Sequence, residues 1–242
     1  EYLIENRLAP IAAFFELPDL HALVAKLRAT RSPQIFDAMT TNETSFFRDG
    51  TPFSILKETA IPELLRARVG SKSINIWCAA CSTGQEPYSI SMLFHDNFPQ
   101  LRNWKIRIVA TDVSEKALQA AKDGMYSQFE VQRGVPIRAL MKHFQQVGNQ
   151  WKISDGIKRC VTFRKFNLLS SYAGLGVPFD IIFIRNVMIY FDNKTKMEIF
   201  TKLRKVTASD GRLFLGGSET VLGLTNLSTR AETKKNYYMP VK

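Results

Sequence analysis

From residue 73 onward the sequence alternates short apolar runs with amphipathic segments, and this alternation constrains the fold more than any other feature. Apolar runs of strand length are predicted at Ser73–Ala79, Lys105–Thr111, Phe179–Ile184 and Arg212–Leu215. Segments of helix length follow or separate them, at Glu86–Asn97, Ser114–Lys122 and Asn193–Val206. Strands that alternate with helices favour a parallel, doubly wound sheet with right-handed crossovers. We therefore expect an α/β fold.

The first seventy residues, in contrast, show only helical periodicity. Apolar residues recur at spacings of three and four within Leu3–Ala12, Leu20–Leu27 and Ile35–Met39. We expect a small helical domain with a linker over residues 1–70, closed by the polar stretch Thr40–Arg48 and two short helices, and a second domain over residues 71–242. Because the chain begins with Glu1 rather than Met, we expect the helical domain to be truncated at its start.

Residues 125–166 interrupt the alternation of the second domain. Pro136–Phe144 has a helical pattern, whereas Gln150–Ser154 and Cys160–Phe166 have strand patterns and are joined through an Asp-Gly turn signal. We expect an insertion that ends in a small antiparallel ribbon. Positive charge is concentrated in the same region, since residues 124–165 carry eight basic and only two acidic side chains.

Composition limits the class of protein without naming a partner. The net charge of +11 favours encounter with any polyanion, whether nucleic acid, acidic protein or anionic lipid. No apolar run approaches the ~20 residues of a membrane-spanning helix, so we expect no membrane-embedded segment. Three cysteines without small-scaffold spacing suggest a reducing compartment, hence the cytoplasm. Cys78 and Cys81 form a C-x-x-C pair, but the histidines are scattered, so we interpret the cysteines as buried apolar residues and expect no metal.

The turn after the first predicted strand, Ala79–Gly84, leads into a helix, as in nucleotide-binding α/β domains. It holds a single glycine, which disfavours a dinucleotide, because a pyrophosphate needs bare backbone at more than one place. Asp112 ends the second strand, where an acid can take two ribose hydroxyls or can equally satisfy only turn N–H groups. Glu86, in the first helical turn, can hold an ammonium group or merely complement the helix dipole. A ribose, an ammonium and no phosphate together suggest S-adenosylmethionine (SAM).

Five sequence blocks carry a resemblance to a known family. In these blocks, and in this order, the sequence resembles the CheR-type chemoreceptor glutamate methyltransferases: TTNETSFFRD (Thr40–Asp49), WCAACSTGQEPYSI (Trp77–Ile90), ATDVSEKAL (Ala110–Leu118), FNLL (Phe166–Leu169) and FDIIFIRNVMIYFD (Phe179–Asp192). The resemblance covers the chain from about residue 1 to residue 220. It implies a Rossmann-like SAM-dependent methyltransferase sheet with a small N-terminal all-α domain and an inserted antiparallel β subdomain.

The resemblance also implies an activity and the residues that serve it. The chain would transfer the methyl group of SAM to glutamate side-chain carboxylates of chemoreceptors and release S-adenosylhomocysteine. SAM would lie between the helical domain and the sheet, with Glu86 on its ammonium group and Asp112 on its ribose. Arg48 would orient the incoming carboxylate and Tyr190 would line the transfer site, so these two are the predicted catalytic residues. The further cofactor-binding residues implied are Asn42, Thr44, Arg48 again, Asn167, Leu168, Asn186 and Val187.

The implied partner is the cytoplasmic signalling domain of chemoreceptors. Two basic surfaces could meet it, one on the N-terminal helices (Lys26, Arg28 and Arg31) and one on the insertion, although either could be only a solvated face. Family members that bind a tether peptide at the receptor's C-terminus carry a longer, Gly-bearing loop than Val147–Gln150. By this resemblance we expect no tether binding here.

Other functions remain open from the sequence. The basic pI of about 9.7 motivates a methyltransferase that acts on nucleic acid, although the acid-Pro-Pro-aromatic tetrad of amino-group methylases is absent and we expect no nucleic-acid partner. A non-catalytic SAM-binding regulatory module is a second alternative, because a sequence cannot demonstrate turnover. A nicotinamide dehydrogenase is disfavoured by the glycine pattern.

Overall fold

The computed structural model describes residues 9, 12–30, 42–176, 178–220, 228–230 and 237–240 of the chain. Its strands are β1 (Ser73–Ala79), β2 (Lys105–Asp112), β3 (Met125–Ser127), β4 (Phe144–Val147), β5 (Gln150–Ile153), β6 (Val161–Lys165), β7 (Phe179–Ile184), β8 (Thr207–Phe214), β9 (Ser228–Arg230) and β10 (Tyr238–Pro240). Its α-helices are α2 (Leu20–Thr30), α4 (Thr51–Ile55), α5 (Ile61–Ala67), α6 (Gln85–Asn97), α7 (Glu115–Asp123), α8 (Gln128–Gln132), α9 (Ile137–His143), α10 (Asp155–Lys158) and α11 (Asn193–Val206). Shorter helical turns are η1 (Leu56–Ala60), η2 (Pro99–Asn103), η3 (Ala173–Leu175) and η4 (Met188–Tyr190).

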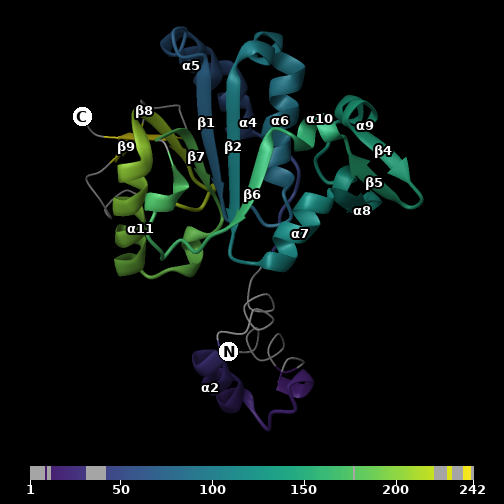
Figure 1. Cartoon of the computed structure of the whole chain (residues 1–242), viewed down its shortest axis with the longest axis vertical. Helices are drawn as coiled ribbons and strands as arrows, with labels where there is room; N and C mark the ends of the chain where they lie inside the picture. The colour runs from purple at the N-terminus through teal and green to yellow at the C-terminus, as the bar shows by residue number, and fades with distance from the viewer. Residues whose placement is uncertain are drawn as a thin grey trace.

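A seven-stranded sheet forms the centre of the molecule, in the order β6-β2-β1-β7-β8-β10-β9 (Figure 1). The first five strands in this order pair in parallel, and β10 pairs antiparallel to both of its neighbours. The expected α/β fold with a doubly wound parallel sheet is therefore confirmed. The strand order reverses between β1 and β7, and in open α/β sheets ligands bind beyond the carboxyl ends of strands at such a point.

Residues on alternate sides of each central strand face two different hydrophobic cores. On β1, Ile74, Ile76 and Cys78 pack with α4, α5 and α6, whereas Trp77 and Ala79 pack on the other face with side chains of α11. This is the two-residue period of a strand covered by helices on both faces. The result is a three-layer sandwich in which β7 is buried along its whole length and β1 over most of it.

The described part of the first seventy residues consists of a piece that contains α2 and a piece that contains α4, η1 and α5. Helices α4 and α5, with η1 between them, contribute Phe53, Leu56, Ile61 and Leu64 to the same core as β1. A division near residue 70 therefore does not separate two hydrophobic cores, and the division into residues 1–70 and 71–242 stays a prediction. The expected helix at Leu20–Leu27 is present as α2, whereas the one at Ile35–Met39 lies outside the described residues.

The insertion contains an antiparallel sheet, but its strands differ from those expected. Strand β5 pairs with β4 on one side and β3 on the other. The predicted partner at Cys160–Phe166 was wrong, because β6 (Val161–Lys165) instead pairs in parallel with β2 as an edge strand of the main sheet. The predicted turn near Asp155 is the short helix α10.

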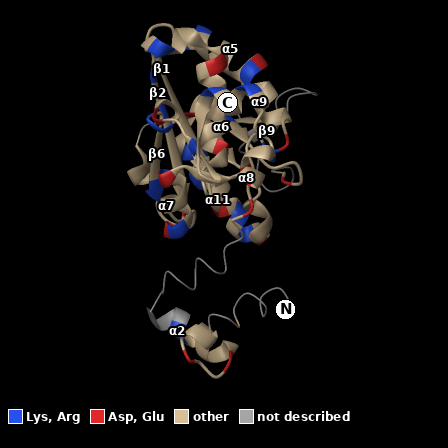
Figure 2. Ribbon diagram, turned by 90° about the vertical axis from the view of Figure 1, so that its right-hand side faces the viewer, with Lys and Arg blue, Asp and Glu red and all other residues tan. Residues whose placement is uncertain are grey.

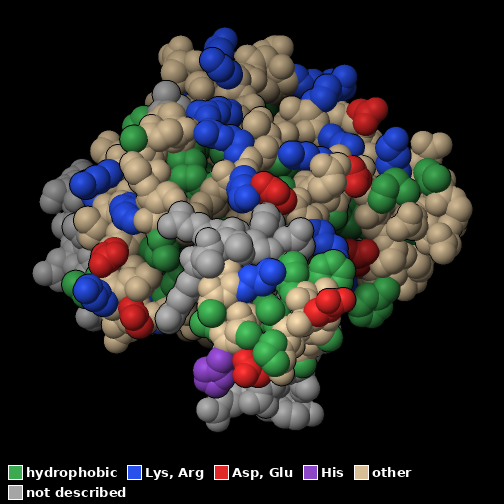
Figure 3. All heavy atoms as spheres, turned by 60° about the horizontal axis from the view of Figure 1, so that its bottom comes forward, with side chains coloured by type: hydrophobic (Ala, Val, Ile, Leu, Met, Phe, Trp, Pro, Cys, Tyr) green, Lys and Arg blue, Asp and Glu red, His purple; other side chains and the backbone are tan. Residues whose placement is uncertain are grey.

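Basic side chains are spread beyond the insertion. Figure 2 shows Lys and Arg near α5, α7, α9 and α11, and Figure 3 shows them over much of the end of the molecule that faces the viewer, with acidic side chains among them. In the described ranges no helix combines the length and the apolar character needed to cross a membrane.

Candidate active site

A cavity of about 420 Å³ opens at the carboxyl edge of the sheet, beside the reversal between β1 and β7. This volume lies in the range of small-molecule sites. The cavity is walled by the loops after β1, β2, β6 and β7, by the start of α6, and by residues 42–48. Its lining residues are Asn42, Glu43, Thr44, Arg48, Ala80, Cys81, Ser82, Glu86, Asp112, Val113, Phe166, Asn167, Leu168, Leu169, Arg185, Asn186, Val187, Tyr190 and Phe191.

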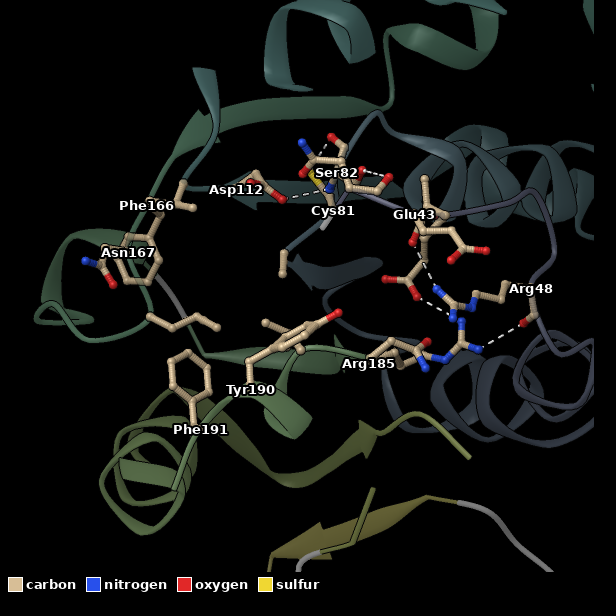
Figure 4. Close-up of a pocket in the computed structure, with 18 of the residues that line it drawn as sticks. Glu43, Arg48, Cys81, Ser82, Asp112, Phe166, Asn167, Arg185, Tyr190 and Phe191 are labelled. Atoms are coloured by element: carbon tan, nitrogen blue, oxygen red, sulfur yellow. Dashed lines mark hydrogen bonds and ion pairs between the residues drawn. The ribbon is translucent and has the colours of Figure 1, made fainter. Parts of the chain in front are cut away.

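All ten predicted site residues line this one cavity. They come from five separate stretches of the sequence, which only the sheet brings together. In Figure 4 the guanidinium groups of Arg48 and Arg185 lie at one end, Phe166, Asn167 and Phe191 lie at the other, and Tyr190 projects between them. The cavity therefore has a charged end and an apolar end.

Backbone strain is concentrated in the loops of the cavity. Ala80, Ser82 and Asn186 all line it and all have positive φ, at 55°, 50° and 58°. A left-handed conformation at a non-glycine residue costs about 1–3 kcal/mol and persists only where surrounding contacts enforce it. Gly84, at φ 93°, begins α6 and leaves no room for a side chain, because an added Cβ would lie 2.9 Å from the Cβ of Ala121.

Asp112 holds the strained loop after β1. Its Oδ2 accepts the backbone N–H of Ser82 at 2.8 Å, and its Oδ1 accepts that of Ser114 at 2.9 Å. The side chain is buried yet lines the cavity. The turn-satisfying role considered from the sequence is thus present. A carboxylate has about four acceptor positions, so an acid at this place can serve turn N–H groups and a ligand hydroxyl together.

Glu86 lies at the charged end, paired with an arginine that the sequence reasoning did not select. Arg185 follows β7 directly and donates from Nη1 to Glu86 Oε2 at 3.0 Å, and from Nη2 to Asp49 Oδ2 at 2.6 Å and to the carbonyl oxygen of Arg48 at 2.9 Å. Burial raises the pKa of Glu86, although the Arg185 charge opposes that shift. The sequence signal for Arg185 was a cation placed directly after a strand that is apolar except for Asp180.

Residues 42–48 are fastened to the sheet domain by several hydrogen bonds, and Arg133 of the insertion donates to Glu43 Oε1 at 2.8 Å. Ser82 Oγ donates to the carbonyl oxygen of Asn42 at 2.8 Å, and the N–H of Phe47 donates to Ser89 Oγ at 2.9 Å. Another is the bond from Arg185 to the carbonyl oxygen of Arg48. The Arg48 side chain turns back along its own segment and donates from Nη1 to the carbonyl oxygen of Glu43 at 3.0 Å. The segment therefore forms a wall that carries Asn42, Thr44 and Arg48.

The apolar end is formed by the segment after β6. Leu168 is buried, whereas Asn167 is exposed and accepts the N–H of Leu169 at 2.9 Å through its side-chain oxygen, which makes a tight local turn. Phe166 packs edge-on against Trp77 beneath the cavity. Flat apolar surface with adjacent polar groups suits an aromatic base.

Tyr190 is the most exposed aromatic residue of the cavity wall, at 60%. It lies in η4, after Asn186 and Val187, and its ring reaches into the cavity in Figure 4. No hydrogen bond to its hydroxyl is formed by the residues that the structure describes, so the hydroxyl is available to a ligand.

The cysteines lie near the cavity without forming a metal site. Cys78 lies on β1 with its side chain in the core, whereas Cys81 lines the cavity. Both are buried, and burial raises the pKa of both thiols. Within the described ranges no group of three or more His, Cys, Asp or Glu side chains could hold a metal ion.

Comparisons with known proteins identify relatives of this chain. Residues 42–237 match the family described as CheR methyltransferase, SAM binding domain. The chain is 41% identical over 233 residues to the chemotaxis protein methyltransferase Cher2 of Pseudomonas putida, which covers 93% of this chain and 84% of that protein. It is 40% identical to chemotaxis protein methyltransferase 1 of Pseudomonas aeruginosa, with the same coverage, and 39% identical to the chemotaxis protein methyltransferase of Vibrio anguillarum, over 93% and 83% of the two chains. Family match, identity and coverage agree with the resemblance of the five sequence blocks, and the chain belongs to the CheR family of SAM-dependent chemotaxis methyltransferases.

Proposed function

We propose that this chain methylates glutamate side chains of chemoreceptors, with the ten predicted residues of the cavity as its working site. One observation carries the proposal. A cavity at the strand reversal brings together two acids, Glu86 and Asp112, and two arginines, Arg48 and Arg185, with an apolar shelf opposite. This arrangement matches a ligand that has an amino-acid end and a nucleoside end.

The donor set fits SAM group by group. Glu86 would hold the ammonium group, Asp112 the ribose hydroxyls, and Asn167 and Leu168 would border the adenine. Arg185 lines the cavity and donates to Glu86, so we assign it to the methionyl carboxylate beside the ammonium group.

When bound, SAM supplies a methyl group on a positively charged sulfur. The acceptor glutamate has an ordinary pKa of about 4.3, so it arrives ionised and the protein needs no general base. What the protein must provide is alignment and the exclusion of water, which together can supply ~7–11 kcal/mol. Arg48 would orient the acceptor carboxylate. Tyr190 would line the transfer site with its hydroxyl, while Asn186 and Val187 would border the sulfur.

For the receptor contact we favour the insertion. It carries the exposed cations Arg133, Arg138 and Lys142 beside the exposed apolar side chains Phe129 and Met141. This mixed surface suits the acidic, amphipathic helices of a receptor signalling domain. On the alternative surface, the side chains of Arg28 and Arg31 lie outside the described residues.

We further propose that this enzyme does not need a receptor tether. The turn between β4 and β5 consists of Gly148 and Asn149 alone. Such a short hairpin offers little surface for a peptide. Titration of a receptor tail peptide by calorimetry tests this, and micromolar binding would refute it.

The test of the activity is transfer of a radiolabelled methyl group from SAM to receptor-containing membranes. We expect label that is released by mild alkali, as a carboxyl ester requires, and a loss of at least ~100-fold for Arg48→Ala, because an orienting charge is removed. Arg102→Ala, which removes an exposed arginine of η2 that does not line the cavity, is the matched control for that loss. Alkali-stable label, or label on nucleic acid in place of receptor, would reject the proposal.

A further inference from the structure

One carboxylate outside the predicted site holds the loop after β7. Glu219 lies in the segment that follows β8, and its Oε2 accepts the backbone N–H of Asn186 at 2.8 Å and that of Gly216 at 2.7 Å. Its Oε1 accepts the N–H of Met188 at 2.7 Å. Distances of this kind are typical of strong bonds to an ionised acceptor. A single side chain thus ties together the carboxyl ends of two neighbouring strands.

The loop that Glu219 holds is strained and lines the cavity. Asn186 has φ 58°, in the left-handed region that few residues with a side chain adopt, although asparagine does so more readily than most. The next residues, Val187 and Tyr190, also line the cavity, whereas Met188 faces a separate hollow that Glu219 helps to line. The bonds to Asn186 and Met188 therefore fix the backbone at both sides of Val187.

The close approach of Gly216 supports the same role. A Cβ at this position would lie 2.7 Å from Glu219 Oε2, 2.9 Å from Asn186 Nδ2 and 3.0 Å from the Asn186 nitrogen. Only a glycine lets the end of β8 come this near to the carboxylate. Glu219, Asn186 and Gly216 thus form a compact unit, the Glu219 clamp, in which one side chain joins two backbone segments.

The molecule uses the same device on the other side of β1. Asp112 accepts the N–H of Ser82, which also has positive φ and also lines the cavity. Asp112 was selected from the sequence because it ends a strand. Glu219 lies on a loop with no such mark, and only the fold shows that its oxygens reach the segment after β7.

We propose that Glu219 is a positioning residue of the methyl-transfer site: its carboxylate holds Asn186–Met188 in the strained form that presents Asn186, Val187 and Tyr190 to the cavity. The inference rests on the proposed function for the use of the cavity. Its effect on the loop can be measured independently of any ligand.

The central variant is Glu219→Gln, which keeps the size of the side chain but sets an NH₂ group against backbone N–H donors. We expect SAM affinity, measured by calorimetry, to fall at least ~10-fold, because at least one bond to a charged acceptor is lost. We also expect kcat to fall together with the affinity, since Tyr190 moves with the loop. Amide hydrogen exchange over residues 184–191 should accelerate in the ligand-free protein.

Gly216→Ala is the second variant, since it keeps the carboxylate but displaces it, and it should change binding and exchange in the same direction. Glu198→Gln makes the same chemical change at an exposed position of α11 and should leave SAM affinity and kcat within twofold of wild type. Glu219→Asp keeps the carboxylate on a shorter side chain. It should bind SAM more weakly than wild type does but more tightly than Glu219→Ala does.

The proposal is overturned if Glu219→Gln binds SAM within twofold of wild type, or if exchange over residues 184–191 is unchanged. It is also overturned if the loss merely follows a smaller folded fraction, with affinity per folded molecule retained. Should Glu219→Gln fail to fold, Gly216→Ala decides by the same criteria. If the wild-type chain itself binds no SAM, the proposed function fails, while the exchange measurement still decides the role of Glu219.

Discussion

At the scale of single residues, Arg185 is the side chain that bonds both the sheet domain and the segment of residues 42–49. Only 2% of it is exposed, and it bonds Glu86 from the sheet domain as well as Asp49 and the Arg48 carbonyl from the segment of residues 42–49. The planar guanidinium group donates to three acceptors that lie in different directions. A lysine ammonium group is a compact point charge and does not reproduce this spread of donors. Arg185 therefore links Glu86 to the segment that carries Arg48.

Arg185→Lys should accordingly weaken SAM binding at least ~10-fold in calorimetry, because Glu86 loses its fixed partner and the wall of residues 42–48 loses an anchor. Arg212→Lys is the matched control. Arg212 is also buried, and it donates to Glu63 away from the cavity. We expect Arg212→Lys to lower stability but to keep SAM affinity within twofold. Equal losses of affinity in both variants would contradict the linking role of Arg185.

The raised pKa of Glu86 predicts a pH dependence of cofactor binding. Burial raises this pKa, so Glu86 takes up a proton at a higher pH than an exposed glutamate does. The protonated form cannot attract an ammonium group, so SAM affinity should fall as the pH falls through the raised pKa and should level off above it. Calorimetry across pH tests this. Glu86→Gln should bind weakly at every pH and lack that acidic limb; a wild-type affinity that stays flat down to about pH 4.3 would refute the assignment.

At the scale of elements, the end of α5 is joined to the sheet by one arginine. Arg68 donates from Nε to Asp180 on β7 at 3.0 Å, and from Nη1 and Nη2 to Asp210 on β8 at 2.9 and 2.6 Å. Asp180 also accepts the N–H of Asn75 on β1. The network therefore connects a helix to three adjacent strands, at the end of the sheet where β1 begins, far along the strand from the cavity.

Arg68→Met should lower the free energy of unfolding by about 3 kcal/mol, because it leaves the 6%-exposed Asp180 without its cation. Asp210→Asn should cost about 1 kcal/mol or less, since that side chain is 43% exposed and water can replace its partner. Urea denaturation measures both. A larger loss for Asp210→Asn than for Arg68→Met would show that the buried carboxylate is not the costly partner.

The elements also show how far sequence patterns reach. The apolar run Phe179–Ile184 and the periodic segment Asn193–Val206 were predicted with the bounds that the structure has, because burial on both faces and amphipathic periodicity are strong signals. The edge strand β6 was assigned to the wrong sheet. Its side chains are largely exposed and two are charged, so its sequence does not indicate that it pairs in parallel with a buried strand. Strand β3 has three residues, too few for any period. Of the ten predicted site residues, Asp112 was selected from its place at a strand end and Glu86 from its place in a first helical turn, and the resemblance to a family supplied the others. The Glu86–Arg185 pair and the bonds from Glu219 to the loop after β7 depend instead on contacts across more than thirty residues of sequence.

At the scale of the whole molecule, the insertion supports the wall of the cavity. Phe46, two residues before Arg48, is 1% exposed and packs edge-on against Tyr126 and Phe144 of the insertion. Its carbonyl oxygen would lie 2.0 Å from a Cβ at Gly134, which has φ 121°. The surface proposed for receptor contact and the segment that carries Arg48 therefore share one hydrophobic cluster.

Gly134→Ala tests this connection. The added methyl group cannot fit against Phe46, so residues 42–48 must shift, and we expect SAM affinity to fall at least ~10-fold while the far-UV circular dichroism of the sheet domain is retained. Gly148→Ala is the control, because Gly148 also has positive φ, at 61°, but faces open space. Alanine at Gly148 costs less backbone strain than alanine at Gly134, because φ 61° lies in the left-handed region, and it meets no steric conflict, so this variant should bind SAM as wild type does. If the two alanine variants bind SAM equally well, the insertion does not support the cavity wall through Phe46. If only Gly134→Ala binds SAM weakly, the insertion supports through Phe46 the wall of the cavity that carries Arg48.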